Sequence, residues 1–291
     1  MANNISLAEK FLPVIDDIYK AQSVTQVLDN DTQVNFVGAN KVQVLKTSTT
    51  GLGDYSRADG YPKGDVTATW ETMTLSVERG KELSIDRMDN EETLGMAFGA
   101  VTGSFMREWV VPEIDVYRFS KYAQAEGISK VSSALTAENI LTEIDKAKKQ
   151  MDADEIPEEG RILFVNSDLQ LLLNQSVSRC YGSDAAVNTI MGTYNGMKVV
   201  YVPTSRFITK VDLADGAASC GFAKATDAEN INFMLVYPGS VLQVQKFAMP
   251  KIFTPDENQD KDMWKFQFRL YHDCFVYENK AKGIYLNTAA E

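Results

Sequence analysis

The clearest pattern along the chain is a run of apolar residues at helical spacing between residues 90 and 126. Its members recur at steps of three or four and form one stripe: Leu94, Phe98, Val101, Phe105, Trp109, Pro112, Val116, Phe119 and Ala123. Charged residues fall off that stripe, namely Glu91, Arg107, Glu108, Asp115, Arg118 and Lys121. At about 1.5 Å per residue, a helix over 90–126 is on the order of 50 Å long. We expect Asp89 or Asn90 to cap it, Gly127 to stop it, and Pro112 to kink or break it.

Before this helix, the pattern changes to alternation. The apolar residues that alternate with polar ones, on both sides of Gly80, are Met73, Leu75, Val77, Leu83 and Ile85. This predicts one apolar face along an extended ribbon. Trp70 is out of phase with that face, so a bulge or twist is expected near Glu71. The loop over 51–64 is rich in glycine and charge, which is turn chemistry and not core.

The remaining elements are shorter. Residues 1–35 form an arm with too little apolar surface to fold alone. We then predict short strands within 34–45, a helix opening at Thr136, and a buried strand over 161–166. A tight turn is expected at Asn195 and Gly196, a hairpin of 231–236 with 241–247, and a long strand over 263–277 with one wet face. This mixture predicts an α+β protein.

Composition narrows the possible functions. The 291 residues carry a net charge of −11. We therefore do not expect the basic surface with which nucleic-acid-binding proteins contact phosphates. An acidic surface could instead lie near nucleic acid without sticking to it. No apolar run reaches the length of about 18 residues that suggests a membrane span. The beginning of the chain does not look like a signal peptide, so we expect an intracellular product. The odd number of cysteines, Cys180, Cys220 and Cys274, favours buried free thiols over disulfides.

A search for catalytic chemistry finds little. His272 lies in the long strand without a visible nucleophile or acid partner, so a structural role is expected. Asp256, Asn258 and Asp260 imitate the start of a calcium loop, but Lys261 and Gln267 stand where that loop needs glycine and glutamate. The acidic segment 152–159 is interpreted as a solvated turn. No nucleophile elbow, phosphate loop or dinucleotide fingerprint is present. We therefore assign no catalytic, cofactor-binding or metal-binding residue and predict a structural protein.

The order of the parts resembles the major capsid proteins of tailed bacteriophages, whose fold encapsulin shells share. In that fold an N-terminal arm precedes an extended two-stranded loop, a long spine helix of a peripheral domain, an axial domain and returning strands. Residues 54–63 resemble the loop tip, and 74–87 resemble the strand that feeds the spine. Residues 110–121 resemble the spine helix, 163–167 the axial-domain entry, and 188–203 its strand hairpin.

This resemblance implies a division of the chain. The arm and first peripheral strands would occupy 1–50, the extended loop 51–80, the peripheral domain 81–135, the axial domain 136–245 and the return strands 246–291. It also implies a self-assembling icosahedral shell of hexamers and pentamers around double-stranded DNA, which is contacted without sequence specificity. Scaffolding would be a separate protein, a portal would be a further partner, and assembly into virions would occur in the host cytoplasm.

The extended loop would supply contacts between subunits. The charged residues proposed for inter-subunit ion pairs are Asp54, Arg57, Asp59, Lys63, Glu71, Glu78, Arg79 and Lys81. Two alternatives stay open. One is an encapsulin-like compartment that holds protein cargo in the same fold. The other is an unrecognised α+β enzyme with a pocket near His272 or the acidic segment.

Overall fold

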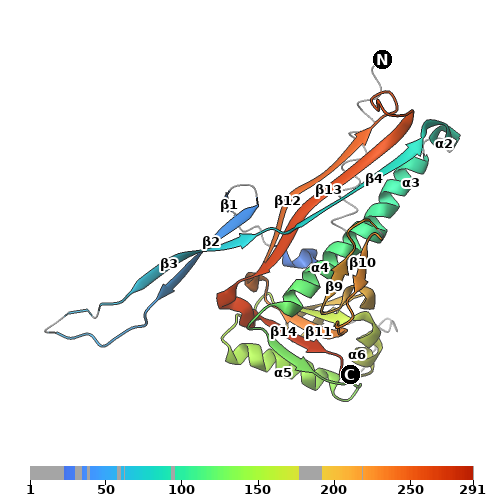
Figure 1. Ribbon diagram of the computed structural model, residues 1–291. Helices are drawn as coiled ribbons and strands as arrows, with labels where there is room; N and C mark the ends of the chain where they lie inside the picture. The colour runs from blue at the N-terminus through green and yellow to red at the C-terminus, as the bar shows by residue number, and fades with distance from the viewer. Residues whose placement is uncertain are drawn as a thin grey trace, which may run out of the picture.

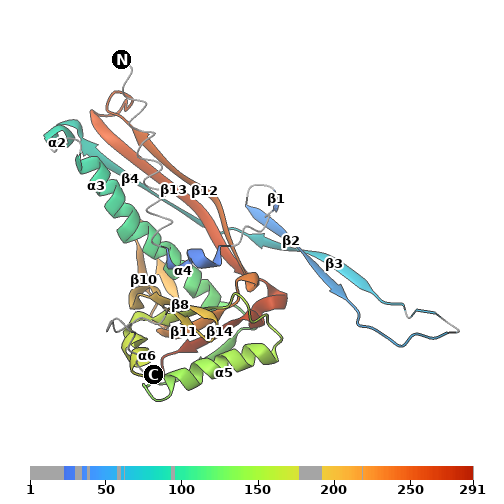
Figure 2. The same cartoon turned by 180° about the vertical axis from the view of Figure 1, so that it is seen from behind.

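The computed structural model describes residues 23–29, 35–37, 40–57, 60–61, 63–92, 96–176, 192–217 and 219–290. The described chain is α+β, as predicted, and it is elongated. A long helix runs beside a sheet of long strands, a second sheet with helices lies at one end, and a narrow hairpin projects from the side (Figure 1). The view from behind shows the same separation of hairpin and body (Figure 2).

The predicted long helix is confirmed in three connected pieces. They are α3 (Met96–Phe105), the π-helical turn η2 (Met106–Val110) and α4 (Val111–Gln124), preceded by the short α2 (Arg87–Glu92). The predicted cap at Asp89 or Asn90 is wrong as an N-cap, because both residues lie inside α2. The amide oxygen of Asn90 still accepts a hydrogen bond from the backbone N–H of Phe98, in the first turn of α3, at 3.3 Å. Gly127 follows its end at φ +78°. The irregularity expected at Pro112 lies in the π-helical turn just before it. Proline has no N–H to donate to the carbonyl four residues earlier, and in a π turn the N–H of the next residue donates to that carbonyl, five residues back.

Three long strands form an antiparallel sheet in the order β12 (Val241–Phe253), β13 (Met263–Val276) and β4 (Val77–Asp86). One face of this sheet packs against the long helix, in a cluster that joins Phe98 and Ile114 to Phe266 and Leu270. The alternation predicted for β13 is confirmed from Trp264 to Tyr271, and it ends at His272, Asp273 and Cys274, which are all buried.

The ribbon predicted over 65–85 is wrong as a single element. Strand β3 (Val66–Thr74) pairs with β2 (Lys41–Thr49), which also pairs with β1 (Asn35–Val37), whereas β4 pairs with β13. The alternating apolar residues continue from β3 into β4, although the two strands lie in different sheets. They therefore pack in three different hydrophobic clusters. The β2–β3 register runs without a shift from Lys41 opposite Thr74 to Thr49 opposite Val66, so the predicted bulge near Glu71 is absent from this pair.

Among the described residues, six strands form the second sheet. Their order is β5 (Ser129–Ser132), β14 (Ile284–Thr288), β11 (Ile231–Val236), β6 (Ile162–Asn166), β8 (Met197–Val202) and β7 (Thr193–Tyr194). Helix α5 (Ile140–Ala153) packs on one face, where Ile144 meets Leu163, and α6 (Gln170–Ser176) joins the same cluster. Helix α4 covers the other face, where Phe119 meets Phe164 with ring centroids 5.2 Å apart. The long helix therefore contributes to both sheets.

Local details confirm some predictions and correct others. Asn195 and Gly196 have φ values of +46° and +80°, as the predicted tight turn requires. The predicted hairpin of 231–236 with 241–247 is wrong, because β11 and β12 belong to different sheets and η5 (Pro238–Ser240) joins them. The predicted range 246–291 holds strands of both sheets. The remaining short elements are β9 (Val211–Leu213), β10 (Phe222–Lys224), η1 (Val24–Leu28), η3 (Ser167–Leu169), η4 (Thr204–Arg206) and η6 (Glu278–Gly283).

Several polar residues are buried where the helix pattern placed them off the apolar stripe. Asp115 and Arg118 are covered by η1, which lies across α4 and supplies them with hydrogen-bond partners. Cys274 is buried, as expected for a free thiol, but Cys220 is exposed, and Cys180 lies outside the described residues. None of the helices described has the length and apolar character needed to cross a membrane.

Candidate assembly surface

The hairpin of β2 and β3 has two chemically different faces, because side chains alternate along each strand. One face carries Val42 and Met73, which are buried at the root of the hairpin against Leu242, Val244 and Tyr277 of the body. This contact attaches only the root. Farther out, the hairpin leaves the body and extends alone (Figure 1).

The opposite face is exposed beyond its root and mixed, since Leu45, Trp70, Ala68 and Val66 alternate there with polar residues such as Thr47 and Thr49. Leu45 and Trp70 lie directly opposite each other in the register and are 47% and 56% exposed. Ala68 and then Val66 follow on that face and are also exposed. Contiguous exposed apolar residues on a soluble protein mark interaction sites. This face is therefore the strongest candidate for a contact with another molecule.

The tip of the hairpin also exposes aromatic side chains. The Tyr55 and Tyr61 rings lie 5.0 Å apart, and Tyr61 is 86% exposed. Backbone hydrogen bonds between Ser56 and Gly60 close the turn beneath them, at 2.8 and 3.2 Å. Exposed aromatic side chains that are held by local structure suit an interface, because little conformational freedom is lost when they are covered.

Of the four charged residues predicted for contacts at the tip, the three that the structure describes are exposed. Asp54, Arg57 and Lys63 have no side-chain partner within the part of the chain that the structure describes, and Asp59 lies outside it. Their part in ion pairs between subunits stays a prediction.

Glu71 lies on the inner face of the hairpin beside Lys46 and Glu278, and Lys46 Nζ lies 3.0 Å from Glu278 Oε2. Partial burial first, and repulsion from Glu278 second, raise the pKa of Glu71, while Lys46 opposes the shift. Glu71 thus belongs to the contact between hairpin and body.

The other three predicted residues lie on β4, in the body and not on the hairpin. Arg79 donates to Glu113 of the long helix, with Nε 2.6 Å from Oε1, and Lys81 Nζ lies 3.3 Å from the Cys220 sulfur. Glu78 accepts from Arg269 Nε at 2.7 Å across the sheet. These three side chains already have partners within their own chain. An inter-subunit role for them stays a prediction that now has to compete with these contacts.

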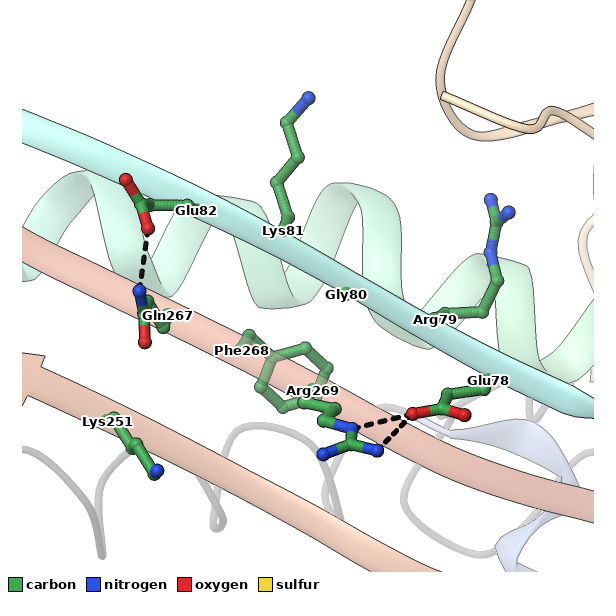
Figure 3. Close-up of a pocket in the computed structure, with 9 residues that line it drawn as sticks. All are labelled: Glu78, Arg79, Gly80, Lys81, Glu82, Lys251, Gln267, Phe268 and Arg269. Atoms are coloured by element: carbon green, nitrogen blue, oxygen red, sulfur yellow. Dashed lines mark hydrogen bonds and ion pairs between the residues drawn. The ribbon is translucent and has the colours of Figure 1, made fainter. Parts of the chain in front are cut away.

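Figure 3 shows the polar face of the long sheet around Gly80. A shallow hollow of about 500 Å³ lies there, lined by Glu78, Glu82, Lys251, Gln267 and Arg269 among others. Glu82 and Gln267 pair across it at 2.6 Å, and Glu78 pairs with Arg269, so its charges are largely satisfied from within. Arg79 and Lys81 point to the opposite side of the strand (Figure 3).

The places where an enzyme would have its pocket are used for internal contacts. His272 is 3% exposed and packs edge-on against Tyr117, with ring centroids 5.5 Å apart. Burial lowers the pKa of His272 to about 3, so it is a neutral core side chain. In the acidic segment, Asp152 pairs with Arg161 and Asp154 with Lys282, both at 2.6 Å. Across the described residues, no cluster of three metal-ligating side chains is found.

The exposed apolar face was not predicted from the sequence, although its signal was present. Trp70 is out of phase with the alternation, and this is the basis for the bulge or twist expected near Glu71. An equally simple cause is that Trp70 points to the other side of a regular strand, where Leu45 joins it. Without the pairing of β2 with β3, the two residues could not be placed together.

The structure resembles solved shell structures over most of its length. A capsid structure of cyanophage P-SCSP1u aligns with a TM-score of 0.60 at 13% identity, covering 88% of this chain and 85% of the other. The mature capsid of bacteriophage PhiM1 aligns with a TM-score of 0.58 at 11% identity, covering 87% and 83%. A virus-like particle from Pyrococcus furiosus gives 0.58 at 12% identity, covering 96% and 98%. No family's sequence profile and no curated protein sequence matches the chain. The chain therefore has the major capsid fold of tailed phages, as the order of its parts predicted.

Proposed function

We propose that this chain is the major capsid protein of a tailed phage. Copies of it assemble into an icosahedral shell of hexamers and pentamers that encloses double-stranded DNA. The observation that carries the proposal is the hairpin, which combines exposed Leu45, Trp70 and Tyr61 with a position clear of its own body. An apolar face of this kind is costly for a solitary subunit and useful for one held by several neighbours.

The remaining parts of the proposal follow from the same fold and from charge. The long helix and the sheet of β12, β13 and β4 make the peripheral part. The six-stranded sheet with α5 and α6 makes the axial part. A net charge of −11 suits a wall that encloses DNA without binding a sequence. A separate scaffolding protein and a portal complete the assembly, which takes place in the host cytoplasm and ends in the virion. No catalytic role is assigned.

Deleting residues 53–64 tests the assembly role of the hairpin. These residues are the tip, and they lie beyond the last β2–β3 pair, Thr49 with Val66. We expect a folded, soluble subunit that builds no regular shells under negative-stain microscopy, with circular dichroism as the check of folding. Normal particles from this deletion variant would overturn the proposal.

A protein compartment is the second candidate, and the likeness to the Pyrococcus furiosus particle over 96% of this chain supports it. The two functions differ in what the shell holds. Nuclease-treated particles from the organism that naturally produces them should retain DNA in the first case and a defined protein in the second. The ratio of nucleic-acid absorbance to protein absorbance detects packaged DNA, and mass spectrometry of the contents identifies a packaged protein. A stable 32 kDa monomer under all assembly conditions, with turnover of some substrate, would instead favour an enzyme.

A further inference from the structure

The hairpin is joined to the body on one side by only two residues. Strand β3 ends at Thr74 in one sheet, and β4 begins at Val77 in another, so Leu75 and Ser76 make the whole connection. The linker lies where the hairpin leaves the body (Figure 1). Each strand of the hairpin has nine residues, or about 30 Å of length. A rotation of about 10° at the root would then move the far end by about 5 Å.

A single buried carboxylate holds Ser76. Asp273 of β13 is 2% exposed. Its Oδ2 accepts hydrogen bonds from the Ser76 backbone N–H at 2.8 Å and from the Ser76 hydroxyl at 2.9 Å. Its Oδ1 accepts from the Tyr117 hydroxyl at 2.7 Å and from the Cys274 N–H at 2.8 Å. A buried carboxylate is tolerated only when its oxygens are satisfied, and these four donors satisfy it.

The other polar groups of the linker are held as well. The Leu75 N–H donates to the carbonyl of Asn40 at 2.8 Å, just before β2 begins, and the Tyr271 hydroxyl donates to the Leu75 carbonyl at 3.2 Å. The Leu75 side chain is buried with Val42 and Met73. Both strands of the hairpin are thus tied to each other and to β13 at the root.

We propose that Asp273 is the positioning residue that sets the angle between the hairpin and the long helix. One oxygen of its carboxylate holds the hairpin through Ser76, and the other holds α4 through Tyr117. Because a carboxylate is rigid, the two elements keep a fixed mutual direction in each subunit. This last step rests on the proposed function. In a shell, a neighbouring subunit that binds the hairpin would also fix the orientation of the long helix in the subunit to which the hairpin belongs.

The angle can be measured on unassembled subunits by pulsed electron paramagnetic resonance. Spin labels go on cysteines introduced at exposed Thr72, which lies close to the root of the hairpin, and at exposed Leu171 of α6. Cys180 and Cys220 are replaced by alanine in this chain. Ser76→Ala removes one hydroxyl donor, and Tyr117→Phe removes the other. Ser84→Ala, at an exposed serine of β4, the strand that follows the linker, is the matched control.

We expect a narrow distance distribution in the parent and in Ser84→Ala, and at least a doubling of its width in Ser76→Ala and in Tyr117→Phe. Unchanged widths in both test variants would overturn the inference. Each variant changes one hydroxyl, and its urea midpoint checks that it folds. If one of them does not fold, the other still decides. Because the labelled subunits are kept below the assembly concentration, a chain that never forms shells could still show this result, so failure of the two proposals is distinguishable.

Discussion

The carboxylate of Asp115 accepts a hydrogen bond from the Thr25 hydroxyl at 2.8 Å and another from the Thr25 backbone N–H at 3.2 Å. Both residues are buried. The same carboxylate also accepts from the Ser23 hydroxyl, the Val24 N–H and Arg206. One side chain of the long helix therefore holds the first described helical turn, η1, in place.

Replacing Asp115 by asparagine should be strongly destabilising. The amide group brings donors to a position surrounded by donors, and hydrogen bonds to a buried charge are worth about 1.5–3 kcal/mol each. We expect the free energy of unfolding in urea to fall by about 3 kcal/mol. Glu159→Gln, at an exposed position of the acidic segment, should change it by less than about 0.5 kcal/mol. Equal effects of the two substitutions would contradict the role given to Asp115.

Trp70→Ala should separate folding from assembly. Trp70 is exposed on the hairpin, so its loss should leave the unfolding midpoint of the subunit almost unchanged. If its face is covered by a neighbour, truncation should raise the critical concentration for assembly by about tenfold or more. Light scattering over a concentration series measures this. Leu171→Ala, an equally exposed apolar residue on α6, is the control and should assemble like the parent. An unchanged critical concentration for Trp70→Ala would remove Trp70 from the interface.

His272 should make the fold sensitive to acid. Its pKa falls from 6.5 in an exposed chain to about 3 in the folded protein, mainly because it is buried. The unfolded state therefore binds a proton that the folded state does not, and stability is lost as pH falls from about 6.5 toward 3. The slope from this group is at most about 1.4 kcal/mol per pH unit. His272→Leu should flatten the curve of unfolding free energy against pH in that range, whatever its constant offset. Parallel curves would show that His272 does not cause the dependence.

Gly221 should tolerate alanine less well than Gly216. Both have φ +86°, so an added side chain is strained equally by the backbone. A Cβ at Gly221 would lie 2.9 Å from the Trp109 ring, whereas nothing lies within 4 Å at Gly216. We expect Gly221→Ala to cost about 1 kcal/mol more than Gly216→Ala in thermal or urea unfolding. Adding Trp109→Ala to each should remove the difference, and a difference that persists would show that the ring is not its cause.

Elements with a strong local signal could be predicted from the sequence. The long helix, the wet and dry faces of β13, the buried strand β6 and the Asn195–Gly196 turn depend on neighbours in the chain, and the structure confirms them. Strand partners were beyond reach, because the pairing of β4 with β13 joins residues about two hundred positions apart. The burial of Asp115 depends likewise on η1, which lies ninety residues away along the chain. Among the candidate contacts, charge drew attention to the tip, while the apolar pair Leu45 and Trp70 required the register of the hairpin.

The outer part of the hairpin has a thermodynamic consequence for the subunit. Two strands alone are marginally stable in water, and beyond the Lys46–Glu278 ion pair this ribbon has only its own cross-strand pairs to hold it. A neighbouring subunit that binds this ribbon stabilises its folded form, and this stabilisation increases with the concentration of subunits. Protection of residues 45–70 against proteases and amide exchange is thus a quantity that depends on how many subunits are present. The ordering of this segment therefore depends on the concentration of subunits, whereas the long helix is ordered within each single subunit.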